Sequence, residues 1–108
     1  MSLTGKVCVP CQGGIPPLTP EQAENLLPQV PGWSLSEDSD RLNRKFEFDD
    51  FATALEFVNK VGELAEQEGH HPDISLGWGY TDIIIFTHKI QGLHENDFIL
   101  AAKVNELS

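Results

Sequence analysis

Residues 69–88, GHHPDISLGWGYTDIIIFTH, hold a turn and two β-rich runs around which the rest of the chain can be arranged. Gly69 supplies the left-handed conformation that ends many helices, and Pro72 disfavours helical backbone in the residue before it. Apolar side chains alternate with small or polar ones over residues 74–80, which predicts a strand with one apolar face. Residues 81–88 are rich in β-formers and predict a second strand.

Helices are predicted on both sides of these strands. Upstream, Asp49 or Asp50 can cap a helix whose apolar residues recur at three- and four-residue steps. We interpret this stripe as core rather than as a cofactor site. Downstream, residues 95–107 form the last helix. The apolar positions are Phe51, Ala54, Leu55, Val58, Val61 and Ala65 in the first helix, and Phe98, Ala101, Ala102 and Val104 in the last.

The N-terminal half predicts a further helix and a hairpin. Residues 19–22 combine an N-cap Thr, a Pro at the first helical position and a Gln that completes a capping box, and the helix ends near Leu27. After a Pro-Gly turn at residues 31–32, the segments 33–36 and 41–48 predict a β-hairpin.

The resulting order is α-β-β-α-β-β-α. This order favours an α+β fold in which a four-stranded antiparallel sheet carries three helices on one face. Residues 19–108 form the domain, and residues 1–18 predict an N-terminal arm with little regular order. Because one domain of this size leaves much apolar surface exposed, we expect a homo-oligomer.

Composition disfavours several classes of function. The chain has 108 residues and a formal net charge of −10, which disfavours nucleic-acid and membrane-surface partners. It has no apolar run long enough for a transmembrane helix and no secretory pattern, so a soluble, cytoplasmic protein is expected. Cys8 and Cys11 form a CxxC pair, but no second Cys or Cys/His pair follows at zinc-ribbon spacing, so neither metal nor redox use is favoured.

All four histidines lie between residues 70 and 94, among several carboxylates. Imidazole titrates near neutrality, so this cluster favours general acid–base chemistry. A metal site is the rival interpretation. His70 and His71 are adjacent and would point to opposite sides of an extended chain, and no HxxxH or HExxH spacing is present.

Each of these residues also has a structural interpretation. His70 and His71 could cap carbonyls at a helix C-terminus, His88 could end a strand, and His94 could cap the last helix. Glu66 lies four residues before His70, where it could hold an imidazole in one tautomer. Asp97 could serve only the helix dipole. Large aromatics such as Trp33 and Trp78 are more often core residues than ligand platforms.

From residue 19 to residue 107, the chain resembles the pterin-4a-carbinolamine dehydratases. The motif consists of His70, His71 and Pro72, then Thr87 and His88, then Gly92 and Asp97. The family's Pro-Gly-Trp turn also occurs at residues 31–33, and Glu66 matches its acidic position. Two positions differ: Ile74 replaces a frequent aromatic, and His94 stands where relatives often carry Ser or Thr.

The resemblance implies that His70, His71 and His88 act on a pterin, with Glu66, Pro72 and Asp97 as supporting or substrate-binding positions. It implies a lyase that converts a 4a-hydroxytetrahydropterin to quinonoid dihydropterin in tetrahydrobiopterin recycling, with no metal or other cofactor. An aromatic amino-acid hydroxylase would supply the substrate. The family assembles as homodimers or homotetramers.

The resemblance also leaves a non-catalytic role open. Some relatives of this fold help to assemble carbon-fixing enzymes, and others are dimerisation partners of transcription factors. Such roles need no acid–base histidines. The complete set of His70, His71 and His88 therefore favours catalysis.

Overall fold

The computed structural model describes residues 3–5 and 16–108, and in these residues it has three α-helices and four β-strands. The helices are α1 (Pro20–Leu26), α2 (Phe51–Glu68) and α3 (Glu95–Leu107). The strands are β1 (Ser34–Leu35), β2 (Leu42–Glu47), β3 (Asp73–Gly77) and β4 (Tyr80–Ile85). Short 3₁₀ turns cover η1 (Leu3–Gly5), η2 (Leu27–Gln29) and η3 (His88–Ile90). The predicted α-β-β-α-β-β-α order and α+β class are confirmed.

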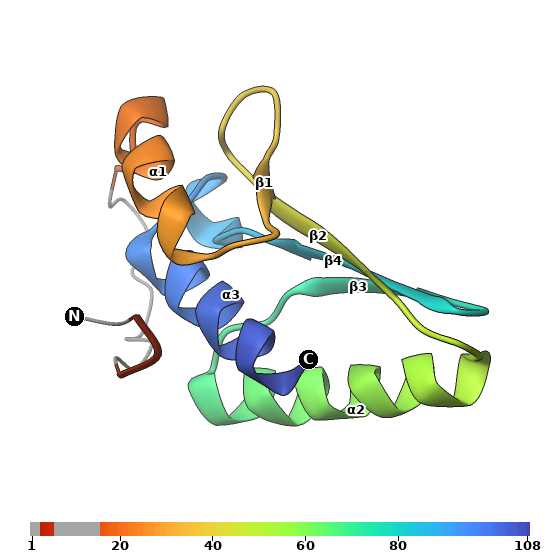
Figure 1. The fold of residues 1–108 in the computed structure, drawn as a ribbon. Helices are drawn as coiled ribbons and strands as arrows, with labels where there is room; N and C mark the ends of the chain where they lie inside the picture. Colours follow the sequence, from red (N-terminus) through yellow and green to blue (C-terminus); the bar gives the residue numbers. More distant parts are fainter. Residues whose placement is uncertain (1–2, 6–15) are drawn as a thin grey trace.

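The sheet is antiparallel throughout, in the strand order β1-β2-β4-β3. β4 is therefore central and pairs with both β2 and β3. Figure 1 shows α2 and α3 on the same side of this sheet, and α1 near the end where β1 pairs with β2. The opposite side of the sheet carries no described helix.

Both predicted helix starts in the first half of the chain have the expected caps. The Thr19 hydroxyl accepts a hydrogen bond from the Gln22 N–H, and the Gln22 side chain accepts one from the Thr19 N–H, which completes the capping box. Asp50 caps α2 by accepting from the Thr53 N–H at 2.8 Å. Gly69 ends α2 with φ of 64°, the left-handed conformation predicted for it.

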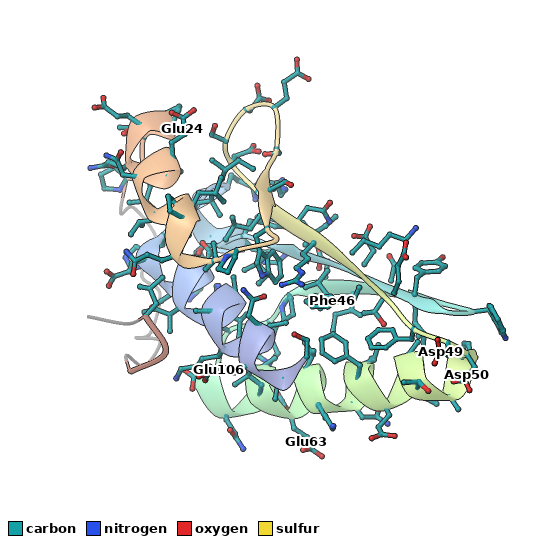
Figure 2. The ribbon with its side chains drawn as sticks, in the orientation of Figure 1. Glu24, Phe46, Asp49, Asp50, Glu63 and Glu106 are labelled. Atoms are coloured by element: carbon teal, nitrogen blue, oxygen red, sulfur yellow. The ribbon has the colours of Figure 1, made fainter. Side chains whose placement is uncertain are left out.

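The core lies between the sheet and the helices. β2 contributes Leu42 and Phe46, β4 contributes Ile83 and Ile85, and the helices contribute Ala23, Phe57, Val61 and Phe98. Phe46 and Phe57 lie with ring centroids 4.7 Å apart, and Phe46 points into the space between the sheet and α2 in Figure 2. The Trp33 indole N–H donates to Asn105 at 2.8 Å, which ties the chain before β1 to α3.

The apolar stripe predicted on α2 was partly wrong. Ala54, Val61 and Ala65 are buried as expected, but Phe51 and Leu55 are 43% and 40% exposed. Phe57, which the prediction omitted, is buried instead. The buried positions Ala54, Phe57, Val61 and Ala65 follow one another at steps of three and four residues. Leu55 lies beside this inward face, and Phe51 is the first residue of the helix.

The strand predicted over residues 74–80 was also too long. β3 ends at Gly77, and Trp78 and Gly79 form a two-residue turn into β4. Gly79 has φ of 78°, a conformation that few other residues adopt, which explains a turn at this point. Trp78 lies at the hairpin tip and is 73% exposed, so it is not the core residue that was expected, whereas Trp33 is buried.

The exterior is strongly acidic. Glu24, Glu63 and Glu106 lie on the outside of α1, α2 and α3, and Asp49 and Asp50 lie at the start of α2 (Figure 2). None of the helices in the described ranges is long and apolar enough to span a membrane. In the predicted arm, Leu3 is buried and η1 contacts α3, whereas Cys8 and Cys11 lie outside the described residues.

Candidate active site

Three of the four histidines line one pocket. The pocket has a volume of about 240 Å³ and lies between the connection that follows α2 and the turn that follows β4. It is lined by Gly69, His70, His71, Thr87, His88 and Lys89. The pairing of β3 with β4 brings these two connections to the same end of the sheet, although they are distant in sequence.

His70 is held by a buried carboxylate. Its Nε2 lies 2.5 Å from Oδ1 of Asp97, whose side chain is fully buried, while the His70 side chain is 11% exposed. The other Asp97 oxygen, Oδ2, accepts from the Thr87 hydroxyl and from the His94 backbone N–H, both at 2.8 Å. A carboxylate only accepts hydrogen bonds, so Nε2 of His70 carries the hydrogen and Nδ1 is the nitrogen left for proton exchange.

His71 has an acidic partner of its own. Its Nε2 lies 2.5 Å from Oε2 of Glu66, one turn back on α2, and both side chains are more than half exposed. The sequence had placed Glu66 near an imidazole, and the structure identifies that imidazole as His71 rather than His70. Because solvent screens this pair, it orients the ring more than it stabilises the fold.

His88 lies on the other side of the pocket. It begins η3, its ring packs on Phe86 with centroids 4.0 Å apart, and its Nε2 lies 3.9 Å from Oδ1 of Asp73. Each of the three pocket histidines therefore has one carboxylate nearby. That carboxylate is buried for His70 and exposed for His71 and His88.

Local backbone features position the two connections. The left-handed Gly69 stops α2 so that the next residue leaves the helix axis, and the His70 N–H donates to the Ala65 carbonyl. On the other side, Thr87 and Gly92 exchange backbone hydrogen bonds, which closes the turn that contains His88. A nearly buried ion pair between Lys103 and Glu68, 2.8 Å long, joins α3 to the end of α2.

The structural interpretations of the histidines have different outcomes. His94 is the N-cap of α3, where its Nδ1 accepts from the Asn96 N–H, so its capping role is confirmed. The rings of His70 and His71 bond to carboxylates, so the expected alternative of caps on helix carbonyls finds no support in these contacts. His88 follows β4 and begins a 3₁₀ turn.

The predicted supporting residues lie at different depths. Asp97 is behind His70 and does far more than serve the helix dipole, because it holds His70, Thr87 and the N-cap together. Glu66 lies at the rim. Pro72 is not among the pocket-lining residues and immediately precedes β3.

Sequence reasoning missed the roles of two residues that lie beside the pocket histidines, Thr87 and Asp73. Thr87 was noticed only as part of the motif, yet its hydroxyl is buried and fixes the carboxylate that holds His70. Asp73 was one carboxylate among many, and its place beside His88 follows from the start of β3. The sequence signal in both cases was adjacency to a histidine motif.

No group of three or more His, Cys, Asp or Glu residues within 3–5 and 16–108 is arranged to hold a metal ion.

The matches to known sequences cover the whole domain. The family model for pterin 4 alpha carbinolamine dehydratase matches residues 16–107. A Methylococcus capsulatus protein provisionally named pterin-4-alpha-carbinolamine dehydratase is 63% identical over 107 residues, which cover 99% of this chain and 94% of that protein. A protein of the same provisional name from Halorhodospira halophila is 62% identical over 107 residues, covering 99% and 98%.

Two solved structures are similar in fold. A protein described as a transcriptional coactivator/pterin dehydratase from Brucella melitensis aligns with a TM-score of 0.79 and 30% identity, over 84% of this chain and 97% of that one. A pterin dehydratase-like protein described as a RuBisCO assembly factor in the alpha-carboxysome aligns with a TM-score of 0.61 and 26% identity, over 70% and 88%.

Proposed function

This chain belongs to the pterin-4a-carbinolamine dehydratase family, and from that membership we propose that it removes water from a 4a-hydroxytetrahydropterin. The reaction breaks the bond between carbon 4a and its hydroxyl, and it takes a proton from the adjacent ring nitrogen, N5. The hydroxyl and the proton leave as water, and a double bond forms between carbon 4a and N5. The product is a quinonoid dihydropterin.

The observation that carries the proposal is the pairing of His70 with the buried Asp97 inside a pocket that also contains His71 and His88. Hydroxide leaves poorly unless its oxygen is protonated, and loss of the N5 proton needs a base. Two imidazoles on opposite sides of one pocket can supply both groups. We assign these roles to His70 and His88, and we assign orientation of the ring to His71.

The Asp97 carboxylate supports either role of His70. It fixes the hydrogen on Nε2 and so presents the Nδ1 lone pair to accept a proton from N5. After that transfer, the negative charge of Asp97 stabilises the resulting imidazolium, which can then donate. Neither step consumes an oxidant or a reductant, so we expect no redox cofactor. Because the histidines can supply both proton transfers, we also expect no metal.

The proposed substrate source is an aromatic amino-acid hydroxylase, because such enzymes leave their tetrahydropterin as the 4a-carbinolamine. The proposed cellular location is the cytoplasm. The second candidate function is partner binding. It is favoured by the similarity to a structure described as a coactivator and to another described as an assembly factor.

An assay with freshly generated 4a-carbinolamine separates the two candidates. We expect the purified protein to accelerate the appearance of quinonoid dihydropterin over the uncatalysed rate, and to keep that activity in a metal chelator. A partner-binding scaffold would give only the uncatalysed rate. Loss of activity on removal of one tightly held zinc or iron ion per chain would contradict the metal-free mechanism.

A further inference from the structure

We propose that Phe86 and Arg41 are positioning residues for His88. The Phe86 ring, with the Arg41 guanidinium on its far face, holds the His88 imidazole in the plane from which it donates a proton to the departing hydroxyl. The inference rests on the proposed function, because His88 is one of the two groups assigned there to proton transfer. Neither Phe86 nor Arg41 is among the residues that line the pocket of the three histidines, which we call the histidine pocket.

His88 lacks the kind of support that the other two pocket histidines have. Nε2 of His70 and Nε2 of His71 each lie 2.5 Å from a carboxylate oxygen, whereas 3.9 Å separates Nε2 of His88 from Oδ1 of Asp73. That distance is too long for a hydrogen bond. Because the His88 side chain is also 58% exposed, its ring needs another contact to fix its plane.

The course of the chain after β4 places Phe86 beside His88. β4 ends at Ile85, and Thr87 has extended backbone, with φ of −94° and ψ of 107°. Alternate side chains of an extended chain point to the same side, so Phe86 and His88 lie together while Thr87 points away from them to donate to Asp97. The ring centroids of Phe86 and His88 are 4.0 Å apart.

Arg41 covers the other face of the Phe86 ring. Its guanidinium carbon lies 3.6 Å from the ring centroid, within the range of a cation–π contact. Two groups this close to one centroid would overlap if they shared a face, so Arg41 and His88 lie on opposite faces. The pockets agree with this arrangement, because Arg41 and Phe86 line a separate hollow of about 490 Å³, whereas His88 lines the histidine pocket.

Arg41 is itself held by the loop between β1 and β2. Its Nη1 donates to the Asp40 carbonyl at 3.1 Å and lies 3.4 Å from the Asp40 carboxylate. That carboxylate accepts from the Ser36 hydroxyl at 2.8 Å, and the same hydroxyl accepts from the Arg41 backbone N–H at 3.0 Å. These bonds fix the guanidinium against Phe86, so the stack has a rigid base.

Proton donation depends on this rigidity. A general acid accelerates a reaction only when its proton is aimed at the departing atom, and a small misplacement costs much of the rate. Phe86 is 8% exposed, so its ring is a fixed surface for the imidazole. Without that surface, His88 remains in the pocket but is aligned for less of the time. The loss should therefore appear in kcat rather than in KM.

The test begins with the stack itself. Phe86→Leu removes the flat ring and keeps an apolar side chain. With freshly generated 4a-carbinolamine, we expect it to lower kcat by about tenfold with KM near the parent value. Phe86→Tyr keeps the ring and should retain most of the activity. Arg41→Met removes the cation from a side chain that is 31% exposed, and we expect it to lower kcat by about threefold.

The chain offers a matched control at a second stack. The Arg44 guanidinium lies 4.3 Å from the centroid of the Phe46 ring, and neither residue lines the histidine pocket. Arg44→Met removes the same kind of contact, together with hydrogen bonds to Pro31 and Asn105. It should lower stability but leave kcat at the parent value.

The inference is wrong if a folded Phe86→Leu variant keeps the parent kcat, or if Arg44→Met lowers kcat as much as Arg41→Met does. Circular dichroism establishes folding. If Phe86→Leu does not fold, the comparison of Arg41→Met with Arg44→Met decides alone, and equal kcat values overturn the inference.

A spectroscopic measurement gives an answer that does not depend on activity. Protons of the His88 ring that lie over the face of Phe86 should resonate upfield of those of an exposed histidine. Phe86→Leu should abolish this shift, and Arg44→Met should preserve it. If the parent protein dehydrates no carbinolamine, the proposed function fails separately, and this spectrum decides whether Phe86 holds the ring. An unshifted His88 in the parent protein would overturn the inference.

Discussion

At the scale of single residues, the central feature of the site is the fully buried carboxylate of Asp97. One carboxylate oxygen faces His70, and the other accepts from Thr87 and from the backbone of His94, while the side chain has no exposure to solvent. A buried carboxylate needs this degree of hydrogen bonding to offset its lost hydration. The same contacts fix His70 in the tautomer that carries its hydrogen on Nε2.

Asp97→Asn tests whether that tautomer matters. The amide oxygen can replace Oδ2 and keep the bonds from Thr87 and His94, but the NH₂ group then faces His70 Nε2 and forces its hydrogen onto Nδ1. We expect kcat to fall by about 10²-fold or more, because a histidine in the wrong tautomer cannot act as the base. Nitrogen chemical shifts of the His70 ring should report the change, with circular dichroism as the folding control. A reversed tautomer with unchanged kcat would remove His70 from the mechanism.

The pocket histidines could be predicted from sequence, but their partners could not. His70, His71 and His88 carry a motif that identifies them without a structure. The partner of His70 lies 27 residues away, and its burial depends on how α3 packs against the core. On so acidic a chain, nothing in the local sequence distinguishes Asp97 from a solvated carboxylate.

At the scale of elements, the end of α2 determines where the histidines lie. Gly69 adopts φ of 64° in open space, so an added methyl group would meet no atom, and only the backbone conformation opposes it. Gly69→Ala should destabilise the protein by about 1 kcal/mol. Gly62→Ala, in the middle of the same helix and also in open space, should stabilise it by about 0.5–1 kcal/mol. Urea denaturation measures both; equal effects would show that the left-handed cap does not constrain the helix end.

The cap at the start of α2 makes the stability of the fold depend on pH. Hydrogen bonds from the Thr53 side chain and backbone N–H lower the pKa of Asp50 below its ordinary value of 3.8. The ionised cap therefore stabilises the fold above pH 3.8, and this contribution is lost as the pH falls through the lower, folded-state pKa. Asp50→Asn keeps a capping oxygen but cannot ionise. Its stability should fall short of the parent near neutrality and approach it in acid; a constant difference across pH would contradict the assignment.

The errors in predicting elements have a common physical origin. The alternation over residues 74–80 was real, but it continued through Trp78 and Gly79, where the chain turns. Glycine at residue 79 was the local signal for that turn. On α2, Phe51 and Leu55 fit a helical period, and only the packing of Phe57 against Phe46 selects which face is buried. The helical spacing of apolar residues therefore identifies a helix more reliably than it identifies which side of that helix is buried.

At the scale of the whole molecule, apolar surface remains uncovered. Phe51, Leu55, Trp78 and Tyr80 are 43%, 40%, 73% and 37% exposed, and β1 and β3 are the edges of an open sheet. We expect association of identical chains to cover part of this surface. Light scattering at micromolar concentration should give a mass of two or four times 12.0 kDa. A mass of one chain, unchanged over a dilution series, would argue against the expected assembly while leaving the histidine pocket intact.

The proposed chemistry needs two proton transfers from one pocket, so the most direct measurement removes the two groups separately and together. Freshly generated 4a-carbinolamine is mixed with the parent protein, with His70→Ala, with His88→Ala and with the double variant, after circular dichroism has confirmed folding. His94→Gln serves as a control at the helix cap outside the pocket. We predict that each single substitution lowers dehydration by about 10²-fold or more, and that the control stays near the parent. A well-folded double variant that dehydrates at the parent rate would contradict the account.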